Sequence, residues 1–322
     1  MVLNFLRRGV SRHLPYHASP RRADDRANLV YPSPWLGRFE SQEDFATGVA
    51  AAPGLGDVIG HIDDQCMASR HPKMFPAFCT GCGSVQTMRF DWSLGGITPE
   101  GATHPAWTET CVCQSCRLNS RMRAVLGFVL SHSAYARTGR CYMAERVTDS
   151  YAAFGRHFAE LASSEYLGPQ HRPGEMVMVA KAAGLVRHED LTRLSFADAS
   201  FGWVVAQDVF EHIPDYAAAF RECARVLSNA GHLVFSIPFN SALSKTQIRA
   251  QVRHDGNIEH LLPPEVHGNP VDGKGALCFQ NFGWDILDTL RASGFARAAA
   301  HTYWGPWFGH VGFGGIVFCA DK

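Results

Sequence analysis

The sequence predicts an α/β fold in which a doubly wound, mostly parallel sheet of seven strands carries helices on both faces. From about residue 140 onward, short apolar runs alternate with segments whose apolar residues recur at helical spacing. This alternation is typical of parallel strands that are joined by helices. The 322 residues are 46% hydrophobic and 19% charged, which is enough apolar material for a large buried core.

The strands of this sheet are expected at residues 141–144, 161–164, 185–188, 203–206, 232–238, 295–303 and 315–320. Helices are expected between them at 149–161, 215–227 and 284–292. Asp215 is suited to capping the second helix, because its carboxylate can accept from the first free backbone N–H groups. Gly231 follows that helix and is expected to end it.

The rest of the chain is expected to divide into a flexible basic arm (1–30), a helical lead-in (31–74) and a cysteine-rich module (75–125). Residues 126–322 then form the large domain. The arm is a frayed terminus in the simplest interpretation, and a partner-docking arm in the alternative. In the lead-in, Ser41 begins one helix and Pro53 precedes the next. A Gly-, Pro- and His-rich insertion at 240–280 interrupts the large domain.

Overall charge and hydropathy exclude several classes of protein. Thirty basic residues balance thirty acidic ones, which argues against a dedicated binder of duplex nucleic acid. No apolar run approaches the roughly 18–20 residues that span a bilayer. The N-terminus has arginines after a very short apolar stretch, which is not the order of a secretory signal. We therefore expect a cytoplasmic protein with no nucleic-acid or membrane partner; its oligomeric state is not predicted.

Two CxxC motifs lie 30 residues apart in the cysteine-rich module. Each motif places two sulfurs on one tight turn, and two such turns can complete a tetrahedral shell of four thiolates. A closed shell is typical of a structural zinc site, with redox-active thiols as the alternative. Cys111 alternates with Cys113 along an extended segment and is expected to point away. The predicted zinc ligands are Cys79, Cys82, Cys113 and Cys116.

Three arginines follow the second CxxC motif, at positions 117, 121 and 123. We interpret them as a solvated helix face, with contacts to an anionic ligand as the alternative.

Four successive predicted strands each end in an acid. The acidic strand exits are Glu145, Glu165, Glu189 with Asp190, and Gln207 with Asp208. Because ligands bind outside the carboxyl ends of the strands in open α/β sheets, these side chains are candidates for one binding site.

Residues 189–239, EDLTRLSFADASFGWVVAQDVFEHIPDYAAAFRECARVLSNAGHLVFSIPF, resemble the class I methyltransferases that use S-adenosylmethionine. The similarity is to the small-molecule, methyltransferase type 11-like branch, with its Rossmann-like fold. The acidic segment, the strand, the EHI-D turn and the RVL helix end follow in the family's order. Some bacterial members also carry a CxxC…CxxC module ahead of the catalytic domain.

The resemblance implies a role for each strand-exit residue. Glu165, with Tyr166 beside it, is expected at the ribose hydroxyls, and Asp190 at the adenine amino group with Leu191 next to the ring. Glu145 is expected to face the methionine amino group. Gln207 and Asp208 are expected near the reacting methyl group.

The loop after Glu145 departs from the family pattern, in which this loop is glycine-rich so that backbone can approach the cofactor. Here Arg146 and Val147 occupy the loop, and no glycine occurs before Gly155. Thr148 is suited to capping the following helix. We expect cofactor binding to be retained because the strand-exit acids are present.

His212 and Asp208 are the predicted catalytic residues. Transfer of a methyl group to a hydroxyl needs a base, and His212 lies near a turn where similar methyltransferases use a histidine. The alternative is a surface histidine at a helix N-terminus. The insertion carries His254, His260 and His267, which we interpret as part of a substrate-covering loop; a metal site and plain loop packing remain alternatives.

The predicted activity is methyl transfer from S-adenosylmethionine to a small hydroxylated acceptor, a sugar or secondary metabolite, with structural zinc as a second cofactor. Two alternatives are left open. One is another use of the sulfonium, such as cyclisation or transfer of a different group. The other is a catalytically silent, zinc-bearing scaffold protein.

Overall fold

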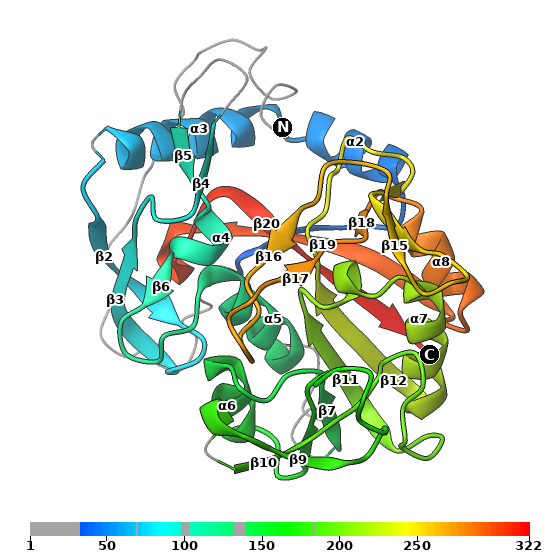
Figure 1. Ribbon diagram of the computed structural model, residues 1–322. Coiled ribbons are helices and arrows are strands. Elements are labelled where there is room, and N and C mark those ends of the chain that lie inside the picture. The colour runs from blue at the N-terminus through cyan, green and yellow to red at the C-terminus, as the bar shows by residue number, and fades with distance from the viewer. Residues whose placement is uncertain (1–32, 69, 98–102, 132–138, 183) are drawn as a thin grey trace.

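The computed structural model describes residues 33–68, 70–97, 103–131, 139–182 and 184–322. Its centre is a seven-stranded sheet with the strand order β1-β19-β20-β12-β11-β7-β8 (Figure 1). Four neighbouring strands run parallel, namely β7 (Cys141–Met143), β8 (Leu161–Ser163), β11 (Phe201–Gln207) and β12 (Leu227–Ser236). Three strands pair antiparallel, namely β20 (His310–Asp321), β19 (Arg297–Gly305) and β1 (Trp35–Phe39). The α/β class is confirmed, but the sheet is mixed rather than mostly parallel.

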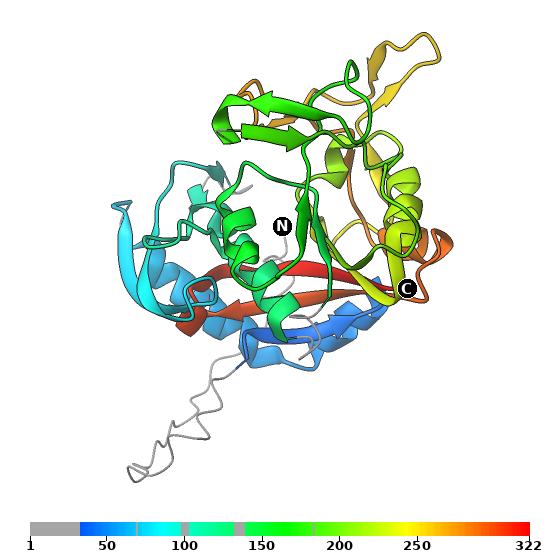
Figure 2. The ribbon, with the colours of Figure 1, turned by 90° about the horizontal axis from the view of Figure 1, so that it is seen from below.

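Helices cover both faces of the sheet (Figures 1 and 2). Successive side chains of β11 point to opposite faces, as the pleat of a strand requires. Trp203 and Val205 join one core cluster, and Val204 and Ala206 join the other. The first cluster contains residues of α5 (Ser120–Ser131) and α6 (Asp149–Gly155), and the second those of α7 (Tyr216–Val226) and α8 (Ile286–Ala292).

The predicted third strand at 185–188 does not join the main sheet. Gly184–Arg187 forms β10 and pairs antiparallel with β9 (Met176–Val179) as a separate hairpin. One parallel bridge, between Glu165 and His188, connects the end of this hairpin to the chain after β8. The seventh strand is β1, from the segment that we expected to be helical throughout.

Strand β1 joins the sheet because its inward side chains are aromatic. Trp35 packs edge-on against Phe128 of α5 and Tyr303 of β19. Two helices then follow as predicted. Ser41 caps α2 (Gln42–Ala50) by accepting from the backbone N–H of Asp44, and α3 (Pro53–Met67) begins with proline at its first position.

The predicted helix at 149–161 is shorter than expected. The helix α6 ends at Gly155, because the chain must turn back within six residues to enter β8. Phe158 lies beyond the helix end but still packs in the same core cluster.

The cysteine-rich module contains the three-stranded sheet β2-β3-β6, a two-stranded hairpin and a short helix. Its elements are β2 (Lys73–Cys79), β3 (Ser84–Phe90), β4 (Gly95–Ile97), β5 (Thr103–Pro105), α4 (Trp107–Thr110) and β6 (Val112–Cys113). Helix α5 crosses the predicted boundary at 125–126, because its apolar side packs against the main sheet. The predicted arm at 1–30 lies outside the described residues.

The insertion at 240–280 is built from short strands that form small two-stranded sheets. They are β13 (Gln247–Ile248), β14 (Ala250–Val252), β15 (Ile258–His260), β16 (Val266–His267), β17 (Ala276–Leu277) and β18 (Gln280–Asn281). Among the described residues, every helix is too short or too polar to cross a membrane.

Asp63 gives the fold a testable dependence on pH. It is buried in α3, where one carboxylate oxygen accepts from the backbone N–H of Gly312 in β20 and the other has no hydrogen-bond partner within the residues that the structure describes. Burial raises the pKa of Asp63 to about 7, against the hydrogen bond from Gly312. The folded protein therefore holds a proton that the unfolded chain releases, and stability falls as the pH rises from about 4 to about 7.

We expect Asp63→Asn to raise the free energy of unfolding at pH 8 by an amount on the order of 3 kcal/mol. The gain should shrink as the pH falls below 4, where Asp63 is protonated in the unfolded chain as well as in the folded protein. Urea unfolding at a series of pH values measures both effects. Asp57→Asn, at an exposed acid of the same helix, is the matched control and should leave the pH dependence unchanged. Equal curves for wild type and Asp63→Asn would contradict the assignment.

Candidate functional site

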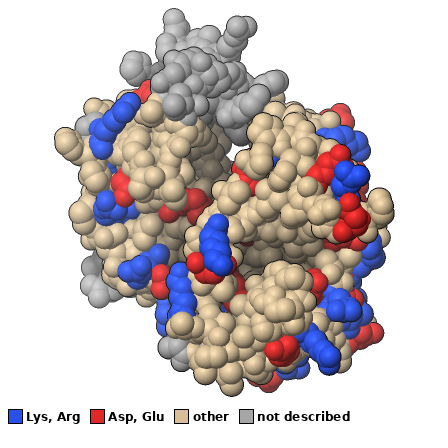
Figure 3. All heavy atoms as spheres, in the orientation of Figure 1, with Lys and Arg blue, Asp and Glu red and all other residues tan. Residues whose placement is uncertain are grey.

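A cavity of about 1160 Å³ opens at the carboxyl ends of the parallel strands. The space-filling view is hollowed near the centre of this face, between the cysteine-rich module and the insertion (Figure 3). The volume exceeds the roughly 300–1,000 Å³ of a typical single-ligand pocket. The sequence-predicted residues that line it are Glu145, Thr148, Glu165, Tyr166, Gln207, Asp208, His212 and His267.

Glu145 and Gln207 form a buried pair in the cavity wall. Gln207 Nε2 donates to Glu145 Oε1 and to Ser150 Oγ, both at 2.6 Å. Thr148 Oγ1 donates to the other oxygen of Glu145, so its hydroxyl is not used as a helix cap. Burial raises the pKa of Glu145 to about 7, although Thr148, the charge of Arg121 and Gln207 oppose it. The side-chain oxygen of Gln207 is buried and has no hydrogen-bond partner in the described part of the chain.

Glu165 ties down the glycine-poor loop. Its Oε1 accepts from the backbone N–H groups of Arg146 and Val147 at 2.6 and 2.9 Å. The Arg146 guanidinium stacks over the ring of Tyr151, 4.1 Å from its centre. Neither Arg146 nor Val147 is among the residues that line the cavity. The bulky loop residues therefore leave the space beside Glu165 open.

Of the other predicted nucleoside contacts, one lines the cavity and two do not. Tyr166 is 57% exposed and lines the cavity. Asp190 does not line it, and its Oδ1 accepts from the backbone N–H and hydroxyl of Thr192. Leu191 is buried in the core and also lies outside the cavity lining. Glu189, the neighbouring acid, is a structural residue that pairs with Arg187 at 2.6 Å.

Asp208 belongs to a partly buried ionic network that the sequence did not predict. Arg121 binds both oxygens of Glu109 through Nε and Nη2 at 2.8 and 2.9 Å, and its Nε lies 3.0 Å from Asp208 Oδ2. Ser236 donates to the other oxygen of Asp208 at 2.8 Å. Burial raises the pKa of Asp208 to about 6, even though the charge of Arg121 opposes this shift. Asp208 also has a left-handed backbone, with φ 51°.

The expected solvated arginine face is wrong for two of its three members. Arg121 lies in the cavity wall, and Arg123 is fully buried, where it donates to the backbone carbonyls of residues 111, 118 and 309. Arg117 is exposed, as expected. Glu109 was not among the predicted site residues. The signal was available as an acid twelve residues before Arg121, but only the packing of α4 against α5 shows that they meet.

His212 also lines the cavity and belongs to the short 3-10 helix η3 (Phe210–His212). Its Nδ1 is 2.9 Å from the carbonyl oxygen of Leu277, and Nε2 is 3.6 Å from Glu211 Oε1. Of the three insertion histidines, His267 lines the cavity beside His212, with ring centres 5.4 Å apart. His254 and His260 are exposed and lie outside the cavity lining.

The four cysteines of the two CxxC motifs converge at one point. Their sulfur atoms all lie within 4.8 Å of one another, with 3.5 Å from Cys79 to Cys116 and 3.9 Å from Cys82 to Cys113. Four thiolates around one zinc ion are spaced roughly 3.8 Å apart. Cys111 points elsewhere, as predicted, and donates its thiol to the carbonyl of Gly309.

Comparison with known families identifies one matching region. Residues 154–235 match the model of a methyltransferase domain. This match supports the predicted class of enzyme, an S-adenosylmethionine-dependent methyltransferase. The comparison with curated proteins found no relative of this sequence.

Among solved structures, the chain is similar to an S-adenosylmethionine-dependent methyltransferase from Mesorhizobium loti, with 16% identity over 62% of this chain and 98% of the other, and a TM-score of 0.41. It is also similar to the 1,6-didemethyltoxoflavin-N1-methyltransferase of Burkholderia thailandensis, with 15% identity over 63% and 78% of the two chains and a TM-score of 0.38. The latter structure contains 1,6-didemethyltoxoflavin and S-adenosylhomocysteine.

Proposed function

We propose that this chain, which carries a methyltransferase domain over residues 154–235, transfers a methyl group from S-adenosylmethionine to a small hydroxylated acceptor. The observation that carries the proposal is the cavity, which is lined by the acids that follow β7 and β8 and by the amide and acid at the exit of β11. Its volume suits two ligands side by side, as a methyl donor and an acceptor require.

The residues present fit S-adenosylmethionine at its charged end. Glu145 is a buried carboxyl beside a buried oxygen of Gln207 that has no partner among the described residues. An ammonium group placed there would donate to both and would lower the raised pKa of Glu145. We therefore assign Glu145 and Gln207 to the methionine amino group.

Glu165 and Tyr166 fit the nucleoside. Both backbone N–H groups that bind Glu165 use Oε1, so Oε2 would accept from a ribose hydroxyl. Tyr166 presents an exposed ring next to it, suited to packing on a base. We keep Asp190 and Leu191 as proposed adenine contacts. For these contacts to form, the chain near Tyr166 would have to move so that the cavity reaches both residues.

The bound donor supplies an electrophilic methyl group, and the chain positions the acceptor for in-line attack. Asp208 and His212 face the remaining space of the cavity, so we propose that the acceptor hydroxyl binds between them. The hydrogen bond from Ser236 and the ion pair with Arg121 hold Asp208 in a fixed orientation. His212 is held by the carbonyl of Leu277, which leaves Nε2 to act.

Calorimetric titration with S-adenosylhomocysteine tests the proposal. We expect one site per chain with a micromolar dissociation constant. A folded protein that gives no heat at high micromolar ligand would overturn the proposal and would favour a silent scaffold protein. With an accepted substrate, mass spectrometry should show a gain of one methylene, and any other mass change would indicate a different use of the sulfonium.

We also propose that the four clustered cysteines hold a structural zinc ion. The full set of four thiolates leaves no open position for substrate. We expect Cys82→Ser to lower the zinc content by one equivalent per chain and to increase proteolysis within residues 73–113. Elemental analysis and limited proteolysis measure this. Cys66→Ser, outside the cluster, is the control and should keep the metal; equal zinc content in both variants would contradict the site.

A further inference from the structure

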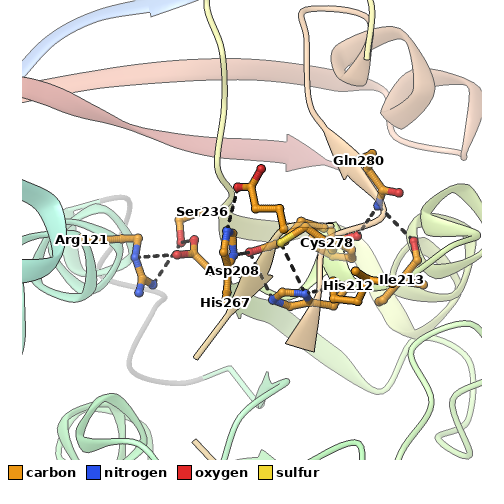
Figure 4. A network of polar contacts seen from close by, with 12 residues as sticks. Arg121, Asp208, His212, Ile213, Ser236, His267, Cys278 and Gln280 are labelled. Carbon is orange, nitrogen blue, oxygen red and sulfur yellow. Dashed lines mark hydrogen bonds and ion pairs between the residues drawn. The ribbon is translucent and has the colours of Figure 1, made fainter. Parts of the chain in front are cut away.

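A second group of metal-ligating side chains lies at the edge of the cavity, apart from the four clustered cysteines (Figure 4). The ligand atoms of His212, His267 and Cys278 lie within 4.8 Å of one another. His212 belongs to the turn after β11, whereas His267 and Cys278 come from the insertion. Two segments far apart in the sequence, the turn after β11 and the insertion, therefore bring two imidazoles and a thiol to one point.

Glu211 adds a buried charge at the same point. Its side chain is fully buried, and neither carboxylate oxygen has a hydrogen-bond partner among the described residues. Its Oε1 lies 3.6 Å from both His212 Nε2 and His267 Nδ1. A buried carboxylate without hydrogen bonds is destabilising unless a cation compensates it.

The outer nitrogens of both imidazoles are already oriented. His212 Nδ1 lies 2.9 Å from the carbonyl oxygen of Leu277, and His267 Nε2 lies 3.1 Å from Glu265 Oε1. Glu265 is held in turn by Arg249 at 3.2 Å. Metal-binding histidines typically donate their second N–H to a carbonyl or carboxylate in this way, which fixes the tautomer that offers a lone pair to the ion. Here both lone pairs then face Glu211.

The backbone around the cluster is also tied together. The backbone N–H of Cys278 donates to the carbonyl of Glu265, and that of Phe279 donates to the carbonyl of Glu211. Gln280 Nε2 donates to the carbonyls of Phe210 and Ile213 at 2.7 and 3.0 Å. The ligand-bearing segments are therefore held in place before any ion binds.

We propose that His212, His267 and Cys278 bind a second divalent transition-metal ion with the ligand preference of zinc, and that the buried carboxylate of Glu211, 3.6 Å from each imidazole, compensates its charge. Two imidazoles and a thiolate suit such an ion, whereas magnesium and calcium prefer oxygen ligands. Three protein ligands leave the fourth position of a tetrahedral zinc ion open.

Binding of the second metal ion does not depend on the proposed function. Only its effect on catalysis rests on that function, because the acceptor is proposed to bind beside His212. The ion would fasten the insertion to the exit of β11 and so fix one wall of the cavity. It would also occupy the lone pair of His212. The ion, rather than the free imidazole, would then act on the acceptor hydroxyl by lowering its pKa.

Counting zinc equivalents tests the second metal site. Titrated with Zn²⁺ at micromolar concentration, the wild-type chain is expected to take up two equivalents. His267→Ala and Cys278→Ser should each take up one, as should Cys82→Ser, and Cys82→Ser/Cys278→Ser none. His260→Ala removes an exposed histidine of the same insertion and should still take up two. Circular dichroism confirms that each variant is folded.

A variant outside the ligand set separates metal binding from damage to the fold. Glu265→Gln retains the side-chain shape but weakens the partner of His267 Nε2, and should lower the affinity of the second ion about 10–100-fold. One equivalent in the wild type, unchanged in His267→Ala and Cys278→Ser, would overturn the proposal and indicate that a protonated His267 neutralises Glu211. Binding of S-adenosylhomocysteine is measured separately, so failure of the second metal site is distinguishable from failure of the proposed function.

Discussion

Replacing Arg121 by methionine is expected to lower the free energy of unfolding by about 3 kcal/mol. The guanidinium lies between Glu109 and Asp208, and its removal leaves two partly buried carboxylates close together without a cation. Its charge helps to hold the pKa of Glu109 below the usual range, although burial opposes this. Urea unfolding measures the loss.

The pH dependence identifies the cause of this loss. Without Arg121, both carboxyls should bind protons more readily in the folded state than in the unfolded chain. The variant should therefore lose less stability at pH 5 than at pH 8. Arg117→Met is the matched control, because that side chain is 78% exposed, and should change stability by no more than about 0.5 kcal/mol. Equal losses for Arg121→Met and Arg117→Met would contradict the network.

Glu165→Ala is expected to weaken binding of S-adenosylhomocysteine by about 100-fold or more. The ribose would lose a charged acceptor, which typically contributes about 1.5–3 kcal/mol for each hydrogen bond, and about 1.4 kcal/mol corresponds to a tenfold change in affinity. The loop N–H groups of Arg146 and Val147 would also lose their acceptor, and the loop would be free to move toward the cavity. Calorimetry measures the affinity.

Two further variants define the role of Glu165. Glu165→Gln keeps an acceptor oxygen and the side-chain shape, and should lie between wild type and Glu165→Ala. Glu160 lies just before β8, is 69% exposed and pairs with Arg140. Glu160→Ala should therefore bind S-adenosylhomocysteine as tightly as wild type does. Unchanged affinity in Glu165→Ala would remove the residue from the cofactor site.

The local elements followed from local signals in the sequence. Ser41 and Asp215 each predict a helix start, because a cap acts within one turn of the chain. Pro53 was expected to break the chain before the second helix, and it is instead the first residue of α3. The apolar runs of β7, β11 and β12 predict buried strands for the same reason. The two CxxC motifs predict a convergent thiolate cluster, since each turn fixes two sulfurs by itself.

Membership of the sheet was decided by tertiary packing. The segment 184–187 has the composition of a strand, but it pairs with Met176–Val179 outside the main sheet. An edge of the main sheet is formed by Trp35–Phe39, where Trp35 packs on Phe128 and Tyr303. Strand pairing depends on which apolar faces meet, and no window of sequence contains both partners.

The sequence by itself determined the α/β class, the helix starts, the acids at the strand exits and the sulfur cluster, because each depends on residues close together in the chain. Only the tertiary structure decided that Arg121 lies between Glu109 and Asp208, and that His267 and Cys278 face Glu211 and His212. These contacts join residues on separate elements, and burial gives them their electrostatic effect. The sequence pattern of Arg121 and Arg123 predicts a solvated helix face, but packing removes both side chains from water and gives each of them specific polar partners.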